Sequence, residues 1–365
     1  MKERPRCHVR LRFRLVSSQG AASRSATSTA RVRVVYAIFN HRPAPQLVRL
    51  VNALGPDGDA IQVVVHHDAS RAALDTTPFR RATGVTLLSS ERPISMGDGS
   101  LMDAYWRLLS WVSEHLALDW LVVLSGQDYP TRPWSELEAL LATAPVDAFL
   151  EAEPVLTWPN SREQRDRYFR YHYRYSRPLM LASRHLLPVP VRRHVRRATR
   201  PCAALFNLAQ RRAHLYEMPD LGPYVIGRYA RHGYPPDLPF WSGSCWMTLR
   251  RTTVEALLAY AEAQPTVVQH FRQTVMPEEA AIATIICNDP SQRVVHHGLH
   301  YIKWSGRRRE HPEVLTSADL PAIRSSGAYF ARKFDAAVDE SVLDTLDRYV
   351  ACVRDTSLDG AHPLP

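Results

Sequence analysis

Features that would mark a membrane-spanning, secreted or zinc-binding protein are largely missing from this sequence. It has no run of about 18 uninterrupted apolar residues, so no transmembrane helix is predicted. The five cysteines are odd in number, far apart and without paired spacing, which is typical of a reducing cytoplasm. Residues 1–33 are basic but lack the apolar core and cleavage site of a secretory signal. We therefore expect a cytoplasmic protein whose membrane contact, if any, is peripheral and made through basic patches.

Patterns that would bind a metal are also weak. Asp57-Gly58-Asp59 has an Asp-x-Asp spacing that can hold a divalent cation, but it precedes its strand and is typical of a plain turn. The histidines of residues 296–300 have no cysteine or acidic partner nearby in the sequence. Cys245 lacks the Gly-x-Ser-x-Gly context of a nucleophile elbow and is interpreted as a core cysteine. We expect neither a metal nor another cofactor.

Positive charge is concentrated in two segments. The net charge is +10, yet residues 1–33 hold nine Lys/Arg and one acid, and residues 162–212 hold fourteen arginines and two acids. The rest of the chain is therefore net acidic. Residues 1–30 are rich in Ser and Ala as well as arginine, and we expect them to form a disordered basic tail. The second segment lies inside the predicted fold.

Strands and helices alternate along the first half of the chain. Dense β-branched and aromatic runs predict buried strands, and amphipathic segments between them predict helices. The strands are expected at 32–39, 61–65, 85–88 and 120–124, and the helices at 46–54 and 101–116. This alternation is typical of an α/β fold with a mostly parallel central sheet flanked by helices. We expect one domain over residues 31–355.

The second half differs in texture. Residues 159–236 are rich in arginine, tyrosine and proline and predict a helical and loop insertion over one face of the sheet. Regular structure is expected to resume at 240–249, with helices at 253–263, 278–287 and 340–354 and a short strand at 293–296. Arginines and tyrosines alternate over residues 162–177, a pattern that can bind RNA or form the basic rim of a sugar-binding cleft.

Residues 276–288 are the stretch around which the candidate chemistry is organised. Pro277, Glu278 and Glu279 precede an alanine and isoleucine run, which predicts a buried helix with proline at its first position. A carboxylate there would be kept ionised by the helix dipole. Both acids could simply cap the helix, or one could act as a general base.

Other candidate ligand-binding residues follow strands or stand between aromatic residues. His67-Asp68 and Asp128 follow predicted strands, at the sheet edge where ligands bind in parallel α/β folds. Asp128 could accept hydrogen bonds from a ligand or stabilise its own turn. Arg332-Lys333 could clamp a diphosphate or be an ordinary surface pair.

Taken together, these stretches resemble the core 2/I-branching β-1,6-N-acetylglucosaminyltransferase and protein O-xylosyltransferase family, glycosyltransferase family 14. The resemblance covers most of residues 34–350, with the motifs in the family's order. They are Asn40, His67-Asp68, Ser100-Leu101, the stretch 124–130 (LSGQDYP), Ser242-Gly243-Ser244-x-Trp246, Pro277-Glu278-Glu279, the stretch 301–306 (YIKWSG) and the stretch 330–335 (FARKFD).

The resemblance implies a GT-A-like nucleotide-sugar-binding fold, with a donor-nucleotide half at 31–150 and an acceptor and catalytic half at 151–355. It also implies a UDP-sugar donor, inversion at the anomeric carbon and no required metal. By the same resemblance, Glu279 is expected to be the general base. The residues expected to bind the donor are Lys333, Arg332, Asp128, His67, Asp68 and Tyr105, with Arg307–Arg309 as possible helpers.

By the same resemblance, the residues expected to bind the acceptor are Glu151, Arg162, Arg165 and Trp246. Tyr105 stands where the branching enzymes carry an acid that touches the donor. The donor sugar is left open between N-acetylglucosamine and xylose, and the acceptor between a glycan, a glycolipid and a protein. The competing hypothesis is an RNA- or anionic-membrane-binding protein that uses the basic tail and residues 162–177. No nucleic-acid partner is expected for the enzyme.

Overall fold

A computed structural model describes residues 31–95, 97–175, 188–209, 212–217, 225–230, 234–304 and 312–356. The chain divides into two compact units, Met1–Arg31 and Val32–Pro365, and only the second is described below. The predicted tail of residues 1–30 and the possible helpers Arg307–Arg309 lie outside the described residues.

A seven-stranded sheet forms the centre of the second unit, with strand order β11-β6-β10-β4-β1-β2-β3. Its strands are β1 (Val34–Asn40), β2 (Ile61–His67), β3 (Val85–Ser89), β4 (Trp120–Ser125), β6 (Ala148–Pro154), β10 (Trp241–Arg250) and β11 (Val294–Val295). Neighbouring strands run parallel except β10, which is antiparallel to β4 and β6. The predicted α/β fold with a mostly parallel sheet is confirmed.

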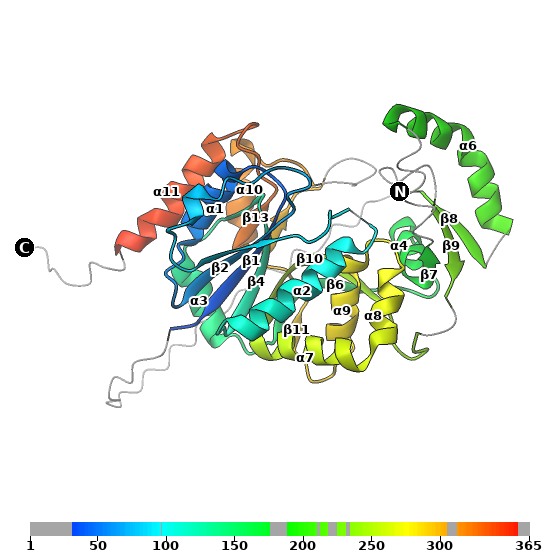
Figure 1. The fold of residues 1–365 in the computed structure, drawn as a ribbon, viewed down its shortest axis with the longest axis horizontal. Coiled ribbons are helices and arrows are strands. Elements are labelled where there is room, and N and C mark those ends of the chain that lie inside the picture. Colours follow the sequence, from blue (N-terminus) through cyan, green and yellow to red (C-terminus); the bar gives the residue numbers. More distant parts are fainter. Residues whose placement is uncertain are drawn as a thin grey trace, which may run out of the picture. The chain divides into compact units, whose positions relative to one another are not determined.

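Helices cover both faces of this sheet (Figure 1). One face packs against α1 (Ala44–Leu54), α3 (Trp134–Thr143), α10 (Leu320–Ser326) and α11 (Ser341–Thr356). The other packs against α2 (Ser100–His115), α7 (Arg251–Ala263), α8 (Pro265–Arg272) and α9 (Ala281–Cys287). Consecutive β1 residues point to opposite faces of the sheet. Tyr36 packs in the core with α1 and α11, Ala37 packs in the core with α2 and α9, and both are buried. A strand buried on both faces needs an unbroken apolar run, which is why β1 was predictable.

Two smaller sheets complete the architecture. One has the order β12-β13-β5, from β12 (His300–Ile302), β13 (Phe330–Arg332) and β5 (Asp128–Pro130). The other has the order β7-β9-β8, from β7 (Tyr173–Tyr175), β9 (Val225–Tyr229) and β8 (Ala213–Tyr216). It belongs to the Arg/Tyr-rich insertion, with the helices α4 (Arg162–His172) and α6 (Val189–Ala209). Short 3₁₀ turns occur at η1 (Thr77–Phe79), η2 (Pro277–Glu279) and η3 (Ser317–Asp319).

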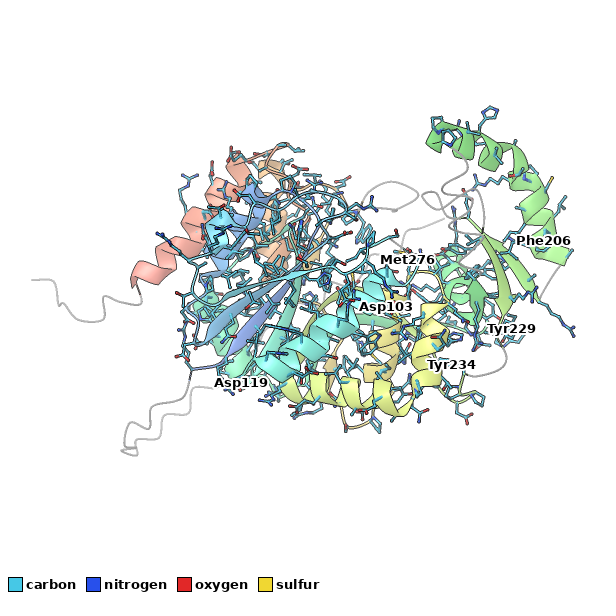
Figure 2. All side chains as sticks on the ribbon, in the orientation of Figure 1. Asp103, Asp119, Phe206, Tyr229, Tyr234 and Met276 are labelled. Carbon is cyan, nitrogen blue, oxygen red and sulfur yellow. The ribbon has the colours of Figure 1, made fainter. Side chains whose placement is uncertain are left out.

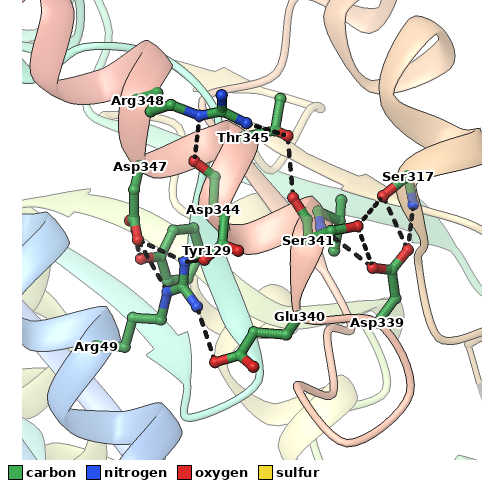
Figure 3. A network of polar contacts seen from close by, with 11 residues as sticks. Arg49, Tyr129, Ser317, Asp339, Glu340, Ser341, Asp344, Thr345, Asp347 and Arg348 are labelled. Atoms are coloured by element: carbon green, nitrogen blue, oxygen red, sulfur yellow. Dashed lines mark hydrogen bonds and ion pairs between the residues drawn. The ribbon is translucent and has the colours of Figure 1, made fainter.

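Side chains fill the space between these layers (Figure 2). The last helix, α11, is tied to the rest of the fold by polar contacts (Figure 3). Arg49 of α1 donates to Asp347 over 2.9 Å and to Asp344 over 2.5 Å. The hydroxyl of Tyr129 also donates to Asp347. Tyr129 lies in the stretch 124–130, and this contact gives it a structural part in docking α11. Within the described residues, no helix is long and apolar enough to cross a membrane.

Candidate active site

The turn that carries the two adjacent acids differs from the predicted helix start. Pro277–Glu279 form a single 3₁₀ turn, and α9 begins only at Ala281. Met276 before the turn has a left-handed backbone with φ of 54°, and Ala280 after it departs from helical angles. The prediction of one continuous helix over 278–287 was therefore wrong at its first turn. Neither acid lies in the first turn of α9, so the helix-dipole argument for an ionised carboxylate does not apply.

Glu278 is buried and electrostatically disfavoured as an anion. It is only 3% exposed, and its Oε2 atom has no hydrogen-bond partner among the described residues. Burial, followed by the negative charge of Glu279, raises the pKa of Glu278 to about 8. A buried carboxyl group without a cationic partner gains a proton rather than staying charged. Glu278 is thus neutral near pH 7, contrary to the expectation that the first-turn acids stay ionised.

Glu279 has a different environment although it is the next residue. Its side chain is 28% exposed, and its Oε2 accepts a 2.9 Å hydrogen bond from Nη1 of Arg170. Burial raises the pKa of Glu279, and the guanidinium of Arg170 opposes this rise. A charge-assisted hydrogen bond of this kind favours the ionised carboxylate. Of the two acids, only Glu279 combines solvent access with a cation.

Arg170 is itself fixed by the Arg/Tyr-rich insertion. Its Nε atom lies 2.8 Å from Oδ2 of Asp166, one turn earlier in α4, and donates to the hydroxyl of Tyr216 on β8 over 2.9 Å. Tyr216 donates in turn to Oδ1 of Asp166 over 2.7 Å. Arg170 was not among the predicted site residues. Its signal in the sequence was the Asp-Arg pair at i and i+4, which is common on helix surfaces and identifies no ligand by itself.

A second cluster joins Asp128 and Arg332, which were predicted to bind the donor, to Trp246, which was predicted to bind the acceptor. Nε of Arg332 donates to Oδ1 of Asp128 over 2.9 Å, and its guanidinium lies 4.2 Å from the ring centroid of Trp246. The two strands β13 and β5 bring this about, because Arg332 and Asp128 are partners in their register. Asp128 is fully buried and also accepts from Ser125. It therefore orients Arg332 instead of facing a ligand, and Trp246 supports the same guanidinium.

Lys333 adds a second cation next to Arg332. Burial lowers the pKa of Lys333, and the charges of Arg332 and Arg42 lower it further. Arg42 is engaged by Asp335, whose Oδ2 lies 2.7 Å from Nη1. No described side chain hydrogen-bonds to the Lys333 ammonium or pairs with it. The three cations Arg42, Arg332 and Lys333 against the two carboxylates Asp128 and Asp335 leave a local excess of one positive charge, which favours an anionic ligand.

Tyr105 and Cys245 lie next to each other, and the charges of Glu278 and Arg332 act on the pKa of both. The Tyr105 hydroxyl donates to the backbone oxygen of Cys245 over 2.8 Å. Burial raises the pKa of the Cys245 thiol to about 12, which Arg332 opposes. Glu278 and Glu279 raise the same pKa further. The turn that carries Glu278 and Glu279 packs against β10, the strand of Cys245 and Trp246, and Trp246 in turn contacts Arg332. β10 therefore links the turn of the predicted base to Arg332. A thiol with so high a pKa is no nucleophile, in agreement with its interpretation as a core cysteine.

Tyr105 itself is a core residue in this structure. It is 1% exposed, and its ring stacks on Phe39 with centroids 4.3 Å apart. Its only polar atom is used by Cys245. In this conformation the Tyr105 side chain is part of the core, so it does not offer a contact to a sugar donor.

His67 and Asp68 lie at the carboxyl end of β2, as predicted, but their polar atoms hold the surrounding backbone. His67 Nδ1 accepts from Asn40 over 3.0 Å, and its Nε2 lies 2.8 Å from the Ala72 oxygen. Asp68 accepts from the backbone of Ser70 and Ile94. Burial would raise the pKa of Asp68, but these hydrogen bonds outweigh it and lower the pKa. Both residues are buried, and their hydrogen bonds hold the loops that follow β1, β2 and β3.

Three of the four predicted acceptor-binding residues, Glu151, Arg162 and Arg165, are exposed, whereas Trp246 is half-buried. No ion pair joins them to one another among the described residues, where the nearby pair is Arg167 with Glu153. Glu151 lies on β6 beside Gly243 of β10, and the two arginines lie on the first turns of α4. The structure thus leaves these side chains accessible without assembling them into one cluster.

The RNA-binding alternative for residues 162–177 requires exposed aromatic rings, and the structure describes this segment up to residue 175. Tyr171, Tyr173 and Tyr175 are each at most 4% exposed: Tyr171 lies in a core of the central sheet, and Tyr173 and Tyr175 lie in the core of the β7-β9-β8 sheet. Arg167 and Arg170 are occupied by carboxylates of the fold. Base stacking needs exposed rings, and these tyrosines do not offer them.

Metal-binding groupings are absent from the parts of the chain that the structure describes, where no cluster of three His, Cys, Asp or Glu side chains could hold an ion. Asp57 Oδ1 instead accepts from the backbone of Asp59 and Ile61, as a turn-forming aspartate does.

Comparison with known proteins identifies relatives. The family model described as Core-2/I-Branching enzyme matches residues 34–324. Two proteins of Arabidopsis thaliana are similar over 120 residues, the beta-glucuronosyltransferases GlcAT14A at 31% identity and GlcAT14B at 32%. The matches cover 32% of this chain and 26% and 27% of the relatives, so the similar region spans only about a quarter of each relative.

Two solved structures also show a likeness. The apo structure of the bifunctional glycosyltransferase WbbM has a TM-score of 0.37 at 9% identity, covering 84% of this chain and 46% of that one. HddC from Yersinia pseudotuberculosis has a TM-score of 0.22 at 12% identity, covering 34% and 60%. Both scores are low, and the assignment depends on the family model, which matches well over half of the sequence. The chain belongs to the Core-2/I-Branching enzyme family.

Proposed function

We propose that this protein is an inverting, metal-independent glycosyltransferase that moves a sugar from a UDP-sugar to a hydroxyl group of a glycan, glycolipid or protein. The observation that carries the proposal is the position of Glu279, an accessible carboxylate bound by Arg170 on a turn that packs against β10, the strand whose Trp246 contacts the Arg332 guanidinium. These are the two charges that a single in-line displacement needs, a base for the attacking group and a cationic site for the leaving group.

In the proposed reaction, Glu279 accepts the proton of the acceptor hydroxyl as the hydroxyl oxygen bonds to the anomeric carbon. The bond between that carbon and the β-phosphate oxygen breaks on the opposite side, and UDP departs with the electron pair. Arg332 and Lys333 stabilise the charge that develops on the diphosphate. Arg332 is already oriented for this by Asp128 and Trp246, so little reorganisation is needed.

Glu279 is preferred over Glu278 as the base for two reasons. A base must be ionised when the acceptor arrives, and the Arg170 hydrogen bond favours that state for Glu279, whereas Glu278 has a pKa of about 8. A base must also reach the acceptor, and Glu279 is partly exposed while Glu278 is 3% exposed. Glu278 serves as a buried, neutral support under the turn.

Three donor sugars are candidates. The motif resemblance favours N-acetylglucosamine or xylose, and the names of the two Arabidopsis relatives add glucuronic acid. A uronate adds one negative charge to those of the diphosphate, and a site with excess positive charge would accept it. We propose that Glu151, Arg162 and Arg165 contact the acceptor, because they are exposed polar side chains on β6 and α4.

The proposal is tested by incubating the protein with UDP-GlcNAc, UDP-xylose, UDP-glucuronic acid, UDP-galactose and UDP-glucose in the presence of EDTA. Release of UDP from one of them, at a rate that Mn²⁺ does not raise, is the expected result. Strict dependence on Mn²⁺ would contradict the metal-independent mechanism. Failure of every UDP-sugar to bind or react would contradict the donor class.

A further inference from the structure

Helix α6 carries an apolar stripe that the fold does not cover. The helix spans Val189–Ala209, and its sequence contains five arginines and no acid. Small and apolar residues recur at alternating spacings of four and three, which places them along one side of a helix. They are Val191, Val195, Ala198, Cys202, Leu205 and Ala209.

The opposite side of α6 faces the protein. Ala203 is 5% exposed, and Asn207, four residues later, brackets the backbone of Leu215 on β8. Its Nδ2 donates to the Leu215 oxygen over 2.9 Å, and its Oδ1 accepts from the Leu215 nitrogen over 2.8 Å. Residues four apart lie on the same side of a helix, so Ala203 and Asn207 define the docked side.

The apolar stripe is consequently left in solvent. Leu205 is 67% exposed and Val191 is 43% exposed. Leu208, which flanks the stripe, is 82% exposed, and Phe206 on the other flank is 36% exposed (Figure 2). Single exposed apolar residues are ordinary, but several on one helix indicate a surface that binds something.

The charge of α6 decides which partner fits. Arg197 and Arg200 are exposed, and three further arginines lie in the same helix. The Arg200 side chain stays 52% exposed although its Nε lies 3.8 Å from Oε2 of Glu217. A second copy of the chain would bring two arginine-rich helices together without an acid on either helix to pair with them, which disfavours a helix–helix dimer. A nucleic acid would use the arginines but leave Leu205 and Leu208 in water. An anionic lipid surface meets both requirements, since it takes apolar side chains among the acyl chains and cations among the headgroups.

We propose that α6 lies in the plane of an anionic membrane surface, with its apolar stripe inserted below the headgroups. The helix docks on β8, where Leu215 is followed by Tyr216, the residue that holds Arg170 and Asp166. Helix α6 therefore contacts β8, the strand whose Tyr216 hydrogen-bonds to Arg170, the partner of Glu279. The proposal itself does not depend on the sugar-transfer chemistry.

Flotation of the full-length protein with lipid vesicles tests it. Vesicles of phosphatidylcholine with phosphatidylglycerol should carry the protein, and Leu205→Glu should weaken this binding at least about tenfold. Val338→Glu is the matched control, because Val338 is 60% exposed in the turn between β13 and α11 and gains the same charge. The neutral double variant Val191→Ser/Leu205→Ser should weaken binding as well, which separates insertion from charge. Circular dichroism confirms that α6 stays folded in each variant.

Several outcomes would overturn the proposal. Wild-type protein that does not float with the anionic vesicles excludes it. Equal loss in Leu205→Glu and Val338→Glu shows that only general electrostatic attraction by the basic segments is at work. A wild-type dimer that Leu205→Glu separates, without vesicle binding, assigns the stripe to a second copy. Salt-sensitive RNA binding that is lost in Leu205→Glu while vesicle binding is unchanged assigns it to nucleic acid.

Discussion

Nη1 of Arg170 donates a 2.9 Å hydrogen bond to Oε2 of Glu279, although the two residues are 109 positions apart in the sequence. The bond joins the Arg/Tyr-rich insertion to the turn after α8, and Asp166 and Tyr216 keep the guanidinium in place. The insertion thereby influences the protonation of Glu279, because burial raises the pKa of this carboxyl group and Arg170 lowers it.

Replacing Arg170 with Met should raise the pKa of Glu279, since burial then acts unopposed. A general base is inactive when it is protonated, so a higher pKa makes activity fall sooner as the pH is lowered. The acidic limb of kcat/KM should therefore move to higher pH by about one unit or more. The pH–rate profile measures this directly. Arg170→Lys keeps the charge and should shift the limb less, and an unchanged limb in Arg170→Met would show that Glu279 is not the titrating base.

Replacing Glu278 with Gln should preserve activity and change the pH dependence of stability. Between the ordinary pKa of 4.5 and the raised pKa of about 8, the folded protein keeps a proton that the unfolded chain loses, so stability falls as the pH rises through this window. Glutamine removes that loss, on the order of a few kcal/mol. Thermal unfolding at pH 5 and pH 8 should show a smaller difference for the variant. An identical difference in both proteins would refute the raised pKa.

Replacing Lys333 with Met should weaken UDP binding about tenfold to a hundredfold, the range expected for a hydrogen bond to a charged group. Isothermal titration with UDP gives the affinity. The control is Arg251→Met, which also removes one cation but from an exposed ion pair with Glu255 on α7. Equal affinities of both variants for UDP would place the diphosphate elsewhere.

Replacing Gly243 with Ala should destabilise the edge of the sheet near Glu151. A Cβ atom there would lie 1.9 Å from the Glu151 backbone oxygen, so β10 and β6 must separate, at a cost of about 2 kcal/mol or more. Gly327→Ala is the comparison, because no heavy atom lies within 4 Å and only its left-handed backbone resists, at about 1 kcal/mol. Chemical denaturation should rank the two in this order, and the reverse order would contradict the close approach.

The central strands were predictable because burial on both faces leaves an unbroken apolar signature, as in β1, β2 and β4. The β7-β9-β8 sheet was not predicted. Its strands are only three to five residues long, and the exposed Ile226 and the buried His214 break the alternation of apolar and polar residues that marks a half-buried strand. This segment was therefore predicted as helix and loop.

The site was predictable only in part, since sequence motifs identify residues but not what their atoms contact. Arg332 and Trp246 were assigned to different substrates, yet the guanidinium lies on the indole ring. Asp128 could have bound a ligand or stabilised its own turn, and in the structure it accepts from Ser125 and from Arg332. The difference between Glu278 and Glu279 arises from one step along a 3₁₀ turn, which turns one acid inward and the other toward Arg170. Such a step depends on the left-handed backbone of Met276, which no local propensity indicates.

The most direct test of the account is Glu279→Gln, assayed for turnover with the reactive UDP-sugar and for UDP affinity, with Glu278→Gln alongside. The amide has nearly the same shape but cannot accept the acceptor's proton. Turnover of Glu279→Gln should fall about a hundredfold to ten-thousandfold while UDP binds as in the wild type, and Glu278→Gln should remain active. Full turnover in Glu279→Gln, or loss of activity in Glu278→Gln alone, would contradict it.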